Sequence, residues 1–338
     1  MLENLIVPKI SILIPVYNVE KYVERCILSV LNQTMLEGVE VIIVNDCTPD
    51  NSMEVINKTL QNSVHLRSER SIKIINHETN KGIAFTRDEA LKYATGEYIL
   101  QIDSDDYLEA DMIEKMYNKA IETGADIVGV DFWRIYENKK VYEKDDISKA
   151  RKILLGEVLK VKHCSRWNKL IKHSLIKKKQ IAYVNGINYG EDYIFMLQCF
   201  HWADKIEYIS HPLYNYIQYN TQSICHKPMN EEHLNGFQHM IDFTANFINI
   251  NHIMGYDYEL AYTKLKIKNI CMMNAMAEQR KKYSHLYPEA NRYKYRFFKE
   301  WRKKVSIYQM ITFYFPFFNI LHLSNVIHKL QNKLKNIK

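Results

Sequence analysis

The sequence predicts an α/β protein with a mainly parallel, Rossmann-like sheet, and three observations support this fold class. Short apolar runs alternate with amphipathic helical segments over the first 130 residues. The helical segments are long enough to carry the chain back across a sheet in right-handed crossovers. Polar residues follow the predicted strands, and the carboxyl ends of parallel strands are where α/β proteins bind ligands.

Five strands and four helices are predicted in this part of the chain. The apolar run Ile10–Val16 is typical of a strand that is buried on both faces. Apolar side chains from Val19 to Leu31 recur at helical spacing and form one stripe. The other predicted strands are 40–45, 72–76, 98–102 and 125–130, and the other predicted helices are 51–60, 83–94 and 112–121, the last closed by Gly124.

The rest of the chain is organised differently. Residues 143–220 are less regular, and long helical patterns follow from residue 230. We therefore expect one domain over 1–222, with a nucleotide-binding half at 9–131 and an acceptor half at 132–222. Residues 223–338 are expected to form a helical C-terminal region with a basic, aromatic tail.

Composition excludes several classes of protein. The formal charge of the 338 residues is +7, but residues 292–338 contain eleven Lys/Arg and one acid, so the remainder is slightly acidic. No secretory signal and no run of 18 apolar residues is evident. The six scattered cysteines form no metal-binding pair and suggest reduced thiols in the cytoplasm. Glycine motifs for dinucleotides or a P-loop are missing.

The acidic run at residues 103–106, Asp-Ser-Asp-Asp, follows an apolar strand. Three carboxylates this close repel one another unless a cation neutralises them, and their oxygens suit Mn²⁺ or Mg²⁺. The same run is also compatible with an acidic turn that caps the next helix. Its composition does not decide between these readings, although its place at a strand end favours a ligand site.

Other polar positions carry similar alternatives. Asp46 follows the second strand, where a carboxylate can bind ribose or a nucleobase, or only cap a helix. Glu191 and Asp192 begin an apolar helix. The pair could provide a general base, or the two residues could be the acids that are common in the first turn of a helix. Trp167 and Lys169 suit either a sugar-binding platform or a tryptophan in the core with a surface neighbour.

Taken together, these motifs resemble the family 2 glycosyltransferases of bacterial polysaccharide synthesis. The shared segments are 12–22, 29–34, 80–82, 96–99, 103–106, 167–170 and 190–192. The resemblance implies a GT-A fold and an inverting transfer of a sugar from a nucleotide-sugar, usually a UDP-sugar, to a glycan or lipid-linked saccharide. It also implies a divalent cation, Mn²⁺ or Mg²⁺, as cofactor.

The resemblance assigns roles to individual residues. For the donor it implies Pro15, Tyr17 and Asp46 at the nucleobase and ribose, and Arg87 near the diphosphate, with Asp103 and Asp105 beside them. It implies Asp105 and Asp106 as metal ligands and Asp192 as the catalytic base. Trp167, Lys169 and Glu191 are the residues that we expect at the acceptor.

Two alternatives compete with this function, and one prediction concerns the tail. A non-catalytic sugar-nucleotide-binding protein would bind donor without turnover. A nucleotidyltransferase would need a basic, glycine-rich loop after the first strand, which this chain does not have. Basic residues alternate with aromatics in 293–338, which favours peripheral binding to the anionic inner face of the cytoplasmic membrane over nucleic acid. Packing of this helical end on the domain is the other reading.

Overall fold

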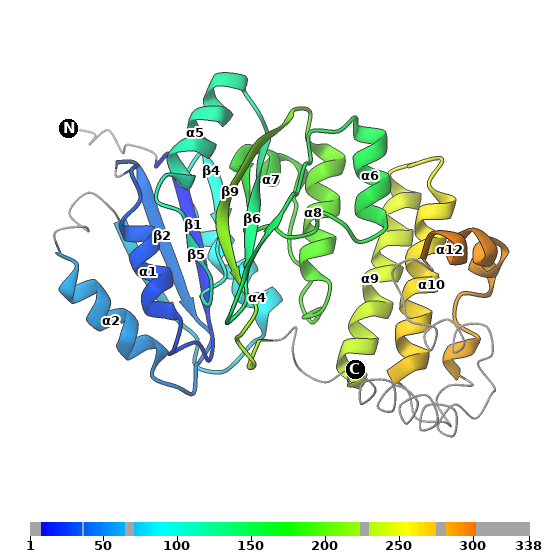
Figure 1. Ribbon diagram of the computed structural model, residues 1–338, viewed down its shortest axis with the longest axis horizontal. Coiled ribbons are helices and arrows are strands. Elements are labelled where there is room, and N and C mark those ends of the chain that lie inside the picture. Colours follow the sequence, from blue (N-terminus) through cyan, green and yellow to red (C-terminus); the bar gives the residue numbers. More distant parts are fainter. Residues whose placement is uncertain (1–7, 36, 65–70, 224–229, 275–281, 302–338) are drawn as a thin grey trace, which may run out of the picture. The chain divides into compact units, whose positions relative to one another are not determined.

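The computed structural model describes residues 8–35, 37–64, 71–223, 230–274 and 282–301. The chain divides into two compact units, 1–228 and 229–338, and each has its own layers of secondary structure (Figure 1). The first unit is an α/β layer structure and the second is helical.

Every strand and helix predicted in the first 130 residues is present. The elements are β1 (Ile10–Val16), α1 (Val23–Leu31), β2 (Val39–Asn45), α2 (Ser52–Asn62), β3 (Ser71–Asn76), α4 (Ile83–Tyr93), β4 (Tyr98–Gln101), β5 (Tyr107–Leu108), α5 (Met112–Thr123) and β6 (Ile127–Ile135). Helix α1 starts four residues later than predicted, because a turn begins at Val19. The carbonyl of Val19 accepts hydrogen bonds from the amides of Tyr22 and Val23. Strand β5 and the length of β6 were not expected.

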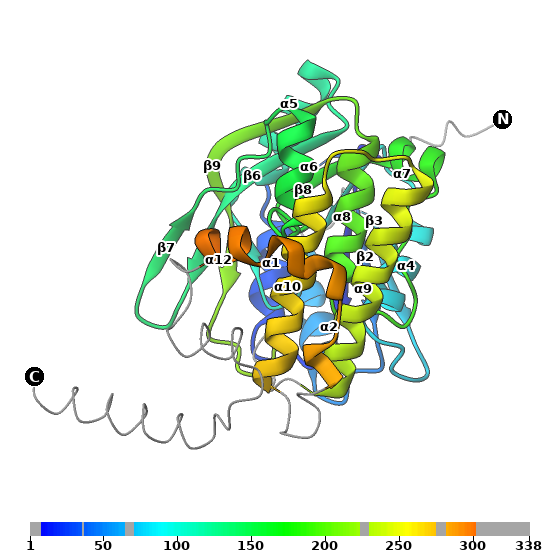
Figure 2. The same cartoon turned by 90° about the vertical axis from the view of Figure 1, so that its right-hand side faces the viewer.

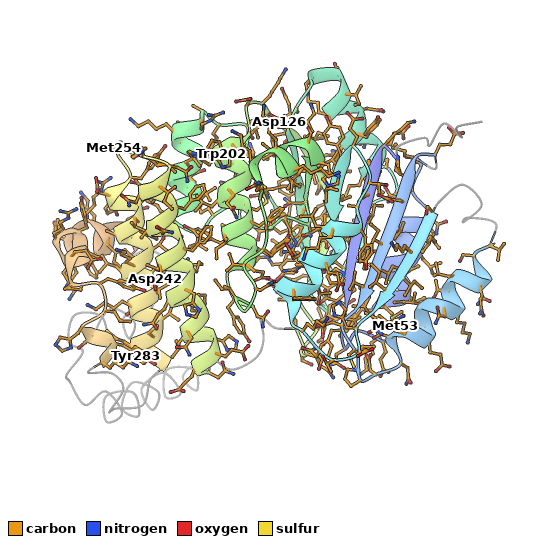
Figure 3. The ribbon with its side chains drawn as sticks, turned by 180° about the vertical axis from the view of Figure 1, so that it is seen from behind. Met53, Asp126, Trp202, Asp242, Met254 and Tyr283 are labelled. Atoms are coloured by element: carbon orange, nitrogen blue, oxygen red, sulfur yellow. The ribbon has the colours of Figure 1, made fainter. Side chains whose placement is uncertain are left out.

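The less regular part of the first unit completes the sheet. Its elements are β7 (Lys140–Glu143), α6 (Arg151–Leu159), β8 (Lys169–Lys172), α7 (His173–Lys179), α8 (Glu191–Trp202) and β9 (Ile206–Ile217). Asp126, which is labelled in Figure 3, accepts hydrogen bonds from the amides of Asp204 (2.8 Å) and Lys205 (3.1 Å). These bonds tie the start of β6 to the start of β9.

In the described residues the strands form one sheet in the order β3-β2-β1-β4-β8-β6-β9-β5, with β7 paired to β6. Strands β3, β2, β1 and β4 are parallel, whereas β8 runs antiparallel to both β4 and β6. Val16 pairs with Asn45 at the carboxyl ends of β1 and β2. The segments that follow β1, β2 and β4 therefore meet at one edge of the sheet, as the sequence predicts.

The core positions these segments by filling both faces of the sheet. On one face, alternate residues of β1 such as Ile12 and Ile14 pack with α1, α2 and α5. Helix α4 packs against β1 and β2 from the other face. Because β1 is buried along its whole length, its carboxyl end is held rigidly.

The second unit contains α9 (Glu231–Ile250), α10 (Asp257–Asn274), a 3₁₀ helix (Pro288–Tyr293) and α12 (Lys294–Trp301). Helices α9 and α10 lie side by side (Figure 2). Asn230 caps α9, since its side chain accepts the amide of His233. No helix in the described residues is both long and apolar enough to cross a membrane.

The start of the predicted basic tail packs within the second unit. Phe297 of α12 is fully buried in a cluster with Tyr262 of α10. Arg296 lies over the ring of Tyr258, 3.5 Å from the ring centroid. This part of the tail follows the second reading of the sequence, packing on its own unit, and residues 302–338 lie outside the described residues.

Candidate active site

The acidic run lies directly after β4, and its three carboxylates have different surroundings. Asp103 Oδ1 accepts hydrogen bonds from Arg87 (2.8 Å) and Arg166 (3.0 Å). Burial alone would raise the pKa of Asp103, but the two guanidinium groups outweigh it and hold the pKa below its ordinary value. Asp103 is therefore an ionised carboxylate whose charge is already neutralised.

Asp106 was predicted as a metal ligand, and the structure does not support this role. The side chain is fully buried, and its two oxygens accept hydrogen bonds from the Tyr214 hydroxyl (2.8 Å) and the Ile217 amide (2.7 Å). Burial and the charges of Asp105 and Asp103 raise its pKa well above the ordinary value. The Asp106 carboxyl group is enclosed by β9 and joins the acidic run to the sheet through these two hydrogen bonds instead.

Asp105 keeps the properties of a metal ligand. It is half-buried, and Asn220 donates a 2.8 Å hydrogen bond to its Oδ2. Burial and the neighbouring Asp103 raise its pKa, and no Lys, Arg or His of the described residues forms an ion pair with it. A nearby cation would favour the ionised form of such a carboxylate.

The donor set fits a divalent ion that is held mainly by substrate. Among the described residues, no group of three or more His, Cys, Asp or Glu side chains could hold a metal alone. Mn²⁺ and Mg²⁺ sites with one or two protein carboxylates are completed by substrate phosphates and water. Asp105 would be one such carboxylate, and a metal at this position stays a prediction.

Residues of α4 and α8 meet the acidic run through a cluster of ion pairs. Arg87 is buried and contacts Asp103, Glu191 and Asp192, the last at 2.9 Å. Burial would lower the pKa of Arg87, but Asp103 and Glu191 raise it above its ordinary value. The structure thus brings together the predicted diphosphate residue and the predicted base.

Arg166 belongs to the same cluster, and the sequence analysis did not single it out. Only 1% of its side chain is exposed, and it pairs with both Asp103 and Asp192. It comes from the segment before β8, beside Trp167, and nothing in the local pattern distinguishes it from a surface arginine. Its role follows only from the antiparallel insertion of β8 beside β4, which brings this segment to the end of β4.

The predicted nucleobase residues lie at the ends of β1 and β2. Pro15 is buried in β1, Tyr17 is 44% exposed, and the amide of Asp46 donates to the carbonyl of Val16. The two loops are therefore neighbours, as expected. The role of these residues at a nucleobase stays a prediction.

The carboxylate of Asp46 also organises the turn before α4. It accepts hydrogen bonds from the amides of Lys81 (2.8 Å) and Gly82 (2.9 Å) and lies 2.7 Å from Nδ1 of His77. Gly82 has φ +85° and ψ 162°, a conformation that only glycine adopts without strain. Asp46 thus fixes the backbone from which Arg87 projects.

Trp167 is part of the core and not an open sugar platform. It is 6% exposed, stacks on Tyr214 with ring centroids 4.4 Å apart, and meets Phe132 edge-on at 4.8 Å. Tyr214 therefore covers one face of the ring. The open platform that the sequence suggested is therefore not formed, because the ring packs against Phe132 of β6 and Tyr214 of β9, and an acceptor contact by Trp167 stays a prediction.

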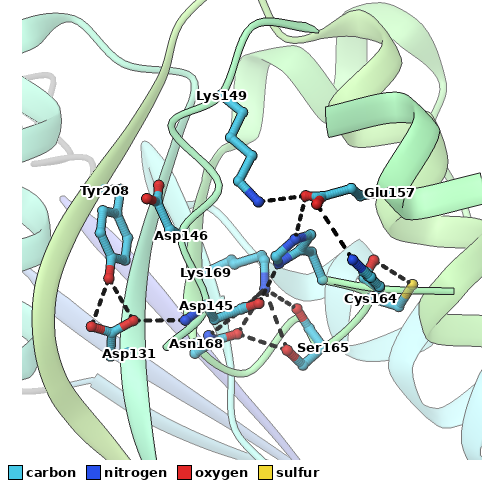
Figure 4. Close-up of polar contacts among 12 residues, drawn as sticks. Asp131, Asp145, Asp146, Lys149, Glu157, Cys164, Ser165, Asn168, Lys169 and Tyr208 are labelled. Atoms are coloured by element: carbon cyan, nitrogen blue, oxygen red, sulfur yellow. Dashed lines mark hydrogen bonds and ion pairs between the residues drawn. The ribbon is translucent and has the colours of Figure 1, made fainter. Parts of the chain in front are cut away.

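Lys169 was also predicted at the acceptor, and the structure buries it completely. Its Nζ donates to Asp145 Oδ2 (2.7 Å), the Ser165 carbonyl (2.7 Å) and Asn168 Oδ1 (2.8 Å) (Figure 4). A buried ammonium with these partners holds the 144–168 segment to β8. Of the three predicted acceptor residues, only Glu191 lies in the arginine cluster.

Comparison with known proteins shows which family the chain belongs to. The family model for glycosyl transferase family 2 matches residues 11–179, half of the chain. The chain belongs to this family. An uncharacterised glycosyltransferase, EpsJ of Bacillus subtilis, is 31% identical over 239 residues, which are 68% of this chain and 67% of EpsJ.

A second relative and a solved structure of the same fold extend this similarity. A hyaluronan synthase of Pasteurella multocida is 46% identical over 108 residues, 32% of this chain and 10% of the synthase. The crystal structure of residues 1–349 of Staphylococcus aureus TarS, in complex with UDP-GlcNAc, superposes with a TM-score of 0.61 at 17% identity, covering 88% of this chain and 93% of that one. The fold is therefore GT-A, as predicted.

Proposed function

We propose that this glycosyltransferase is an inverting enzyme that transfers a sugar from a nucleotide-sugar, a UDP-sugar, to a hydroxyl of a glycan or lipid-linked saccharide. The observation that carries the proposal is the link from Asp103, through Arg87 and Arg166, to Asp192. It holds a partly exposed carboxylate of α8 beside the strand end where the donor is expected. The complex of TarS with UDP-GlcNAc supports a uridine nucleotide.

The reaction needs one base and one site for the leaving group. In the proposed step, Asp192 removes the proton of the acceptor hydroxyl while its oxygen forms a bond to the anomeric carbon. The bond from that carbon to the diphosphate oxygen breaks, and the electron pair leaves with the nucleoside diphosphate. Inversion at the anomeric carbon follows from this single in-line displacement.

The leaving group is expected at Asp105 and Arg87. A divalent cation, when bound at Asp105 together with the diphosphate, supplies charge stabilisation to the departing oxygen. Arg87 presents a planar guanidinium, which suits phosphate oxygens. Its present partners are carboxylates, so a diphosphate would compete with them for its N–H groups.

Donor turnover tests this proposal. UDP-, GDP- and dTDP-sugars are first ranked by thermal shift with Mn²⁺, and nucleotide release from the best donor is then measured. We expect Asp192→Asn to bind the nucleotide normally and to lose about 10²- to 10⁴-fold in turnover, the usual worth of a general base. Asp204→Asn, at an exposed side chain, is the matched control.

Two results would count against the proposal. Full turnover by Asp192→Asn would remove the base assignment. Nucleotide binding without turnover by the unmodified chain, over the whole donor panel, would favour the non-catalytic binding protein.

A further inference from the structure

Arg166 occupies an unusual position for a cationic side chain. It is almost fully buried, and its two terminal nitrogens point to different elements of the fold. Nη2 lies 3.0 Å from Asp103 Oδ1 after β4, and Nη1 forms an ion pair with Asp192 in the first turn of α8. One guanidinium therefore connects the donor end of the sheet to the helix that carries the proposed base.

The charges around Arg166 show why a second arginine is needed. Asp103, Glu191 and Asp192 are three carboxylates, and Arg87 contacts all of them. With Arg87 alone, the cluster would hold three anions around one cation. Leaving carboxylates unpaired in a buried site is costly and favours their neutral forms.

The two arginines differ in what else they are expected to bind. Arg87 is the residue that the family resemblance places at the diphosphate, and a bound donor would draw its N–H groups away from the carboxylates. Arg166 contacts Asp103 and Asp192, and its guanidinium carbon lies 5.9 Å from the centroid of the Tyr183 ring. Arg166 is then the cation that stays with Asp192.

We propose that Arg166 is the positioning residue of the reaction, which keeps the Asp192 carboxylate ionised and oriented toward the acceptor while the donor occupies Arg87. This inference rests on the proposed function, because it gives Asp192 the role of base. It adds a residue that contacts the carboxylate of the proposed base and acts through it. A buried arginine that stabilised the fold without contacting Asp192 would not affect the ionisation of the base.

The charged groups that face Asp192 determine its apparent pKa, which a pH profile of turnover measures. They are Arg87 from α4, Arg166 from the segment before β8, Glu191 from its own helix, and Asp103 across the two arginines. Removing Arg166 withdraws one of the two cations and leaves the three anions in place. The apparent pKa of the base must then rise, since opposite charge is what favours its ionised form.

The experiment compares Arg166→Met, which removes the charge at similar length, with Arg166→Lys, which keeps it. Donor hydrolysis, in which water replaces the acceptor hydroxyl, is followed from pH 5 to 9. For Arg166→Met we expect the acid limb of the kcat profile to move up by about 1 to 2 pH units, with recovery of turnover at alkaline pH. Arg166→Lys should retain most of the wild-type profile, and nucleotide Kd should change by less than about threefold in both.

Arg134→Met is the control for loss of an arginine in the same unit. Arg134 lies on β6, pairs with Glu143 at 3.4 Å and is about one-third exposed. Its variant should show the wild-type profile. An unshifted acid limb in Arg166→Met would overturn the inference and leave the glycosyltransferase proposal intact.

A second measurement does not depend on turnover. Arg166→Met is expected to lower Tm because it leaves three carboxylates around the single cation Arg87, and adding Asp192→Asn, which removes one of these anions, should restore part of that loss. Strictly additive Tm changes would overturn the link between these residues even if no donor were turned over. If Arg166→Met did not fold, Arg166→Gln and Arg166→Lys would replace it, and equal acid limbs for those two would refute the charge argument.

Discussion

The hydroxyl of Tyr214 on β9 donates a 2.8 Å hydrogen bond to Asp106, and this contact separates the last acid of the 103–106 run from the other two. Both residues are fully buried. Burial raises the pKa of Tyr214 well above its ordinary value, so the phenol remains a donor. The run thus contains one fold-forming carboxyl, one neutralised carboxylate and one free to take a cation.

The structural role of Asp106 predicts different results for substitutions at the two partners of this hydrogen bond. Asp106→Asn keeps an oxygen for the Ile217 amide and a group that can pair with Tyr214, so we expect near-normal Tm and metal-dependent turnover. Tyr214→Phe leaves one Asp106 oxygen without its donor and should destabilise the fold by about 1–3 kcal/mol. Thermal unfolding of both variants checks this, and a large loss of turnover in a well-folded Asp106→Asn would contradict it.

Metal removal is the second prediction. Chelation with EDTA should abolish turnover, and Mn²⁺ or Mg²⁺ should restore it, because the leaving diphosphate gains charge that a cation stabilises. Asp105→Asn should lower turnover by about 100-fold or more at saturating Mn²⁺, the scale of losing one group that stabilises transition-state charge. Turnover that is insensitive to EDTA in metal-free buffer would remove the metal from the proposal.

Acid stability should depend on the cluster around Asp145. His163 lies between Asp145 and Glu157, with Nδ1 and Nε2 at 2.5 and 2.9 Å from their oxygens. Partial burial alone would raise the pKa of Glu157, but hydrogen bonds from Lys149 and His163 outweigh this effect and lower the pKa to about 2. Lys169 and His163 likewise lower the pKa of Asp145, against the effect of its burial.

The sign of the pH dependence follows from these lowered values. Carboxylates whose folded pKa is depressed stabilise the fold above their ordinary pKa, and this stability is lost as pH falls toward the folded pKa. Tm should therefore decrease as the pH is lowered from about 5 to about 2. The variant Glu157→Gln should have a lower Tm than the wild type at pH 7, and its Tm should decrease less steeply as the pH is lowered. Parallel Tm curves for the wild type and this variant would rule out the linkage.

Membrane binding by the basic tail remains a prediction, and the structure changes how it is tested. Phe297 is buried within the second unit, so removal of 293–338 would also damage the core of that unit. A chain that ends at Trp301 avoids this, and it removes seven Lys/Arg and no acids. It should pellet less with anionic liposomes than the full chain, with neutral liposomes as control, and equal pelleting would refute the idea.

Local patterns were sufficient to predict the first half of the fold. The buried run Ile10–Val16 and the helical stripe after it depend only on spacing along the chain. The grouping of Asp103, Asp105 and Asp46 at one edge follows from parallel strand ends. These features need no knowledge of which distant segments pair.

The errors arise where distant pairing decides the environment. Trp167, Lys169 and Arg166 lie in one short segment, and their burial depends on β8 running antiparallel between β4 and β6. No residue pattern signals that insertion. Asp106 was misread because a turn gives no fixed alternation of side chains, so only the contact with β9 shows its direction.

The connection of Arg166 to Asp103 has a consequence for recombination between family members. Arg87 and Asp103 belong to the half expected to bind the nucleotide, whereas Arg166 and Asp192 belong to the half expected to select the acceptor. A chimaera joined near residue 131 would divide this ion cluster between two parents. Acceptor halves should therefore be exchangeable only among relatives that carry a cation equivalent to Arg166, whatever sugars they recognise.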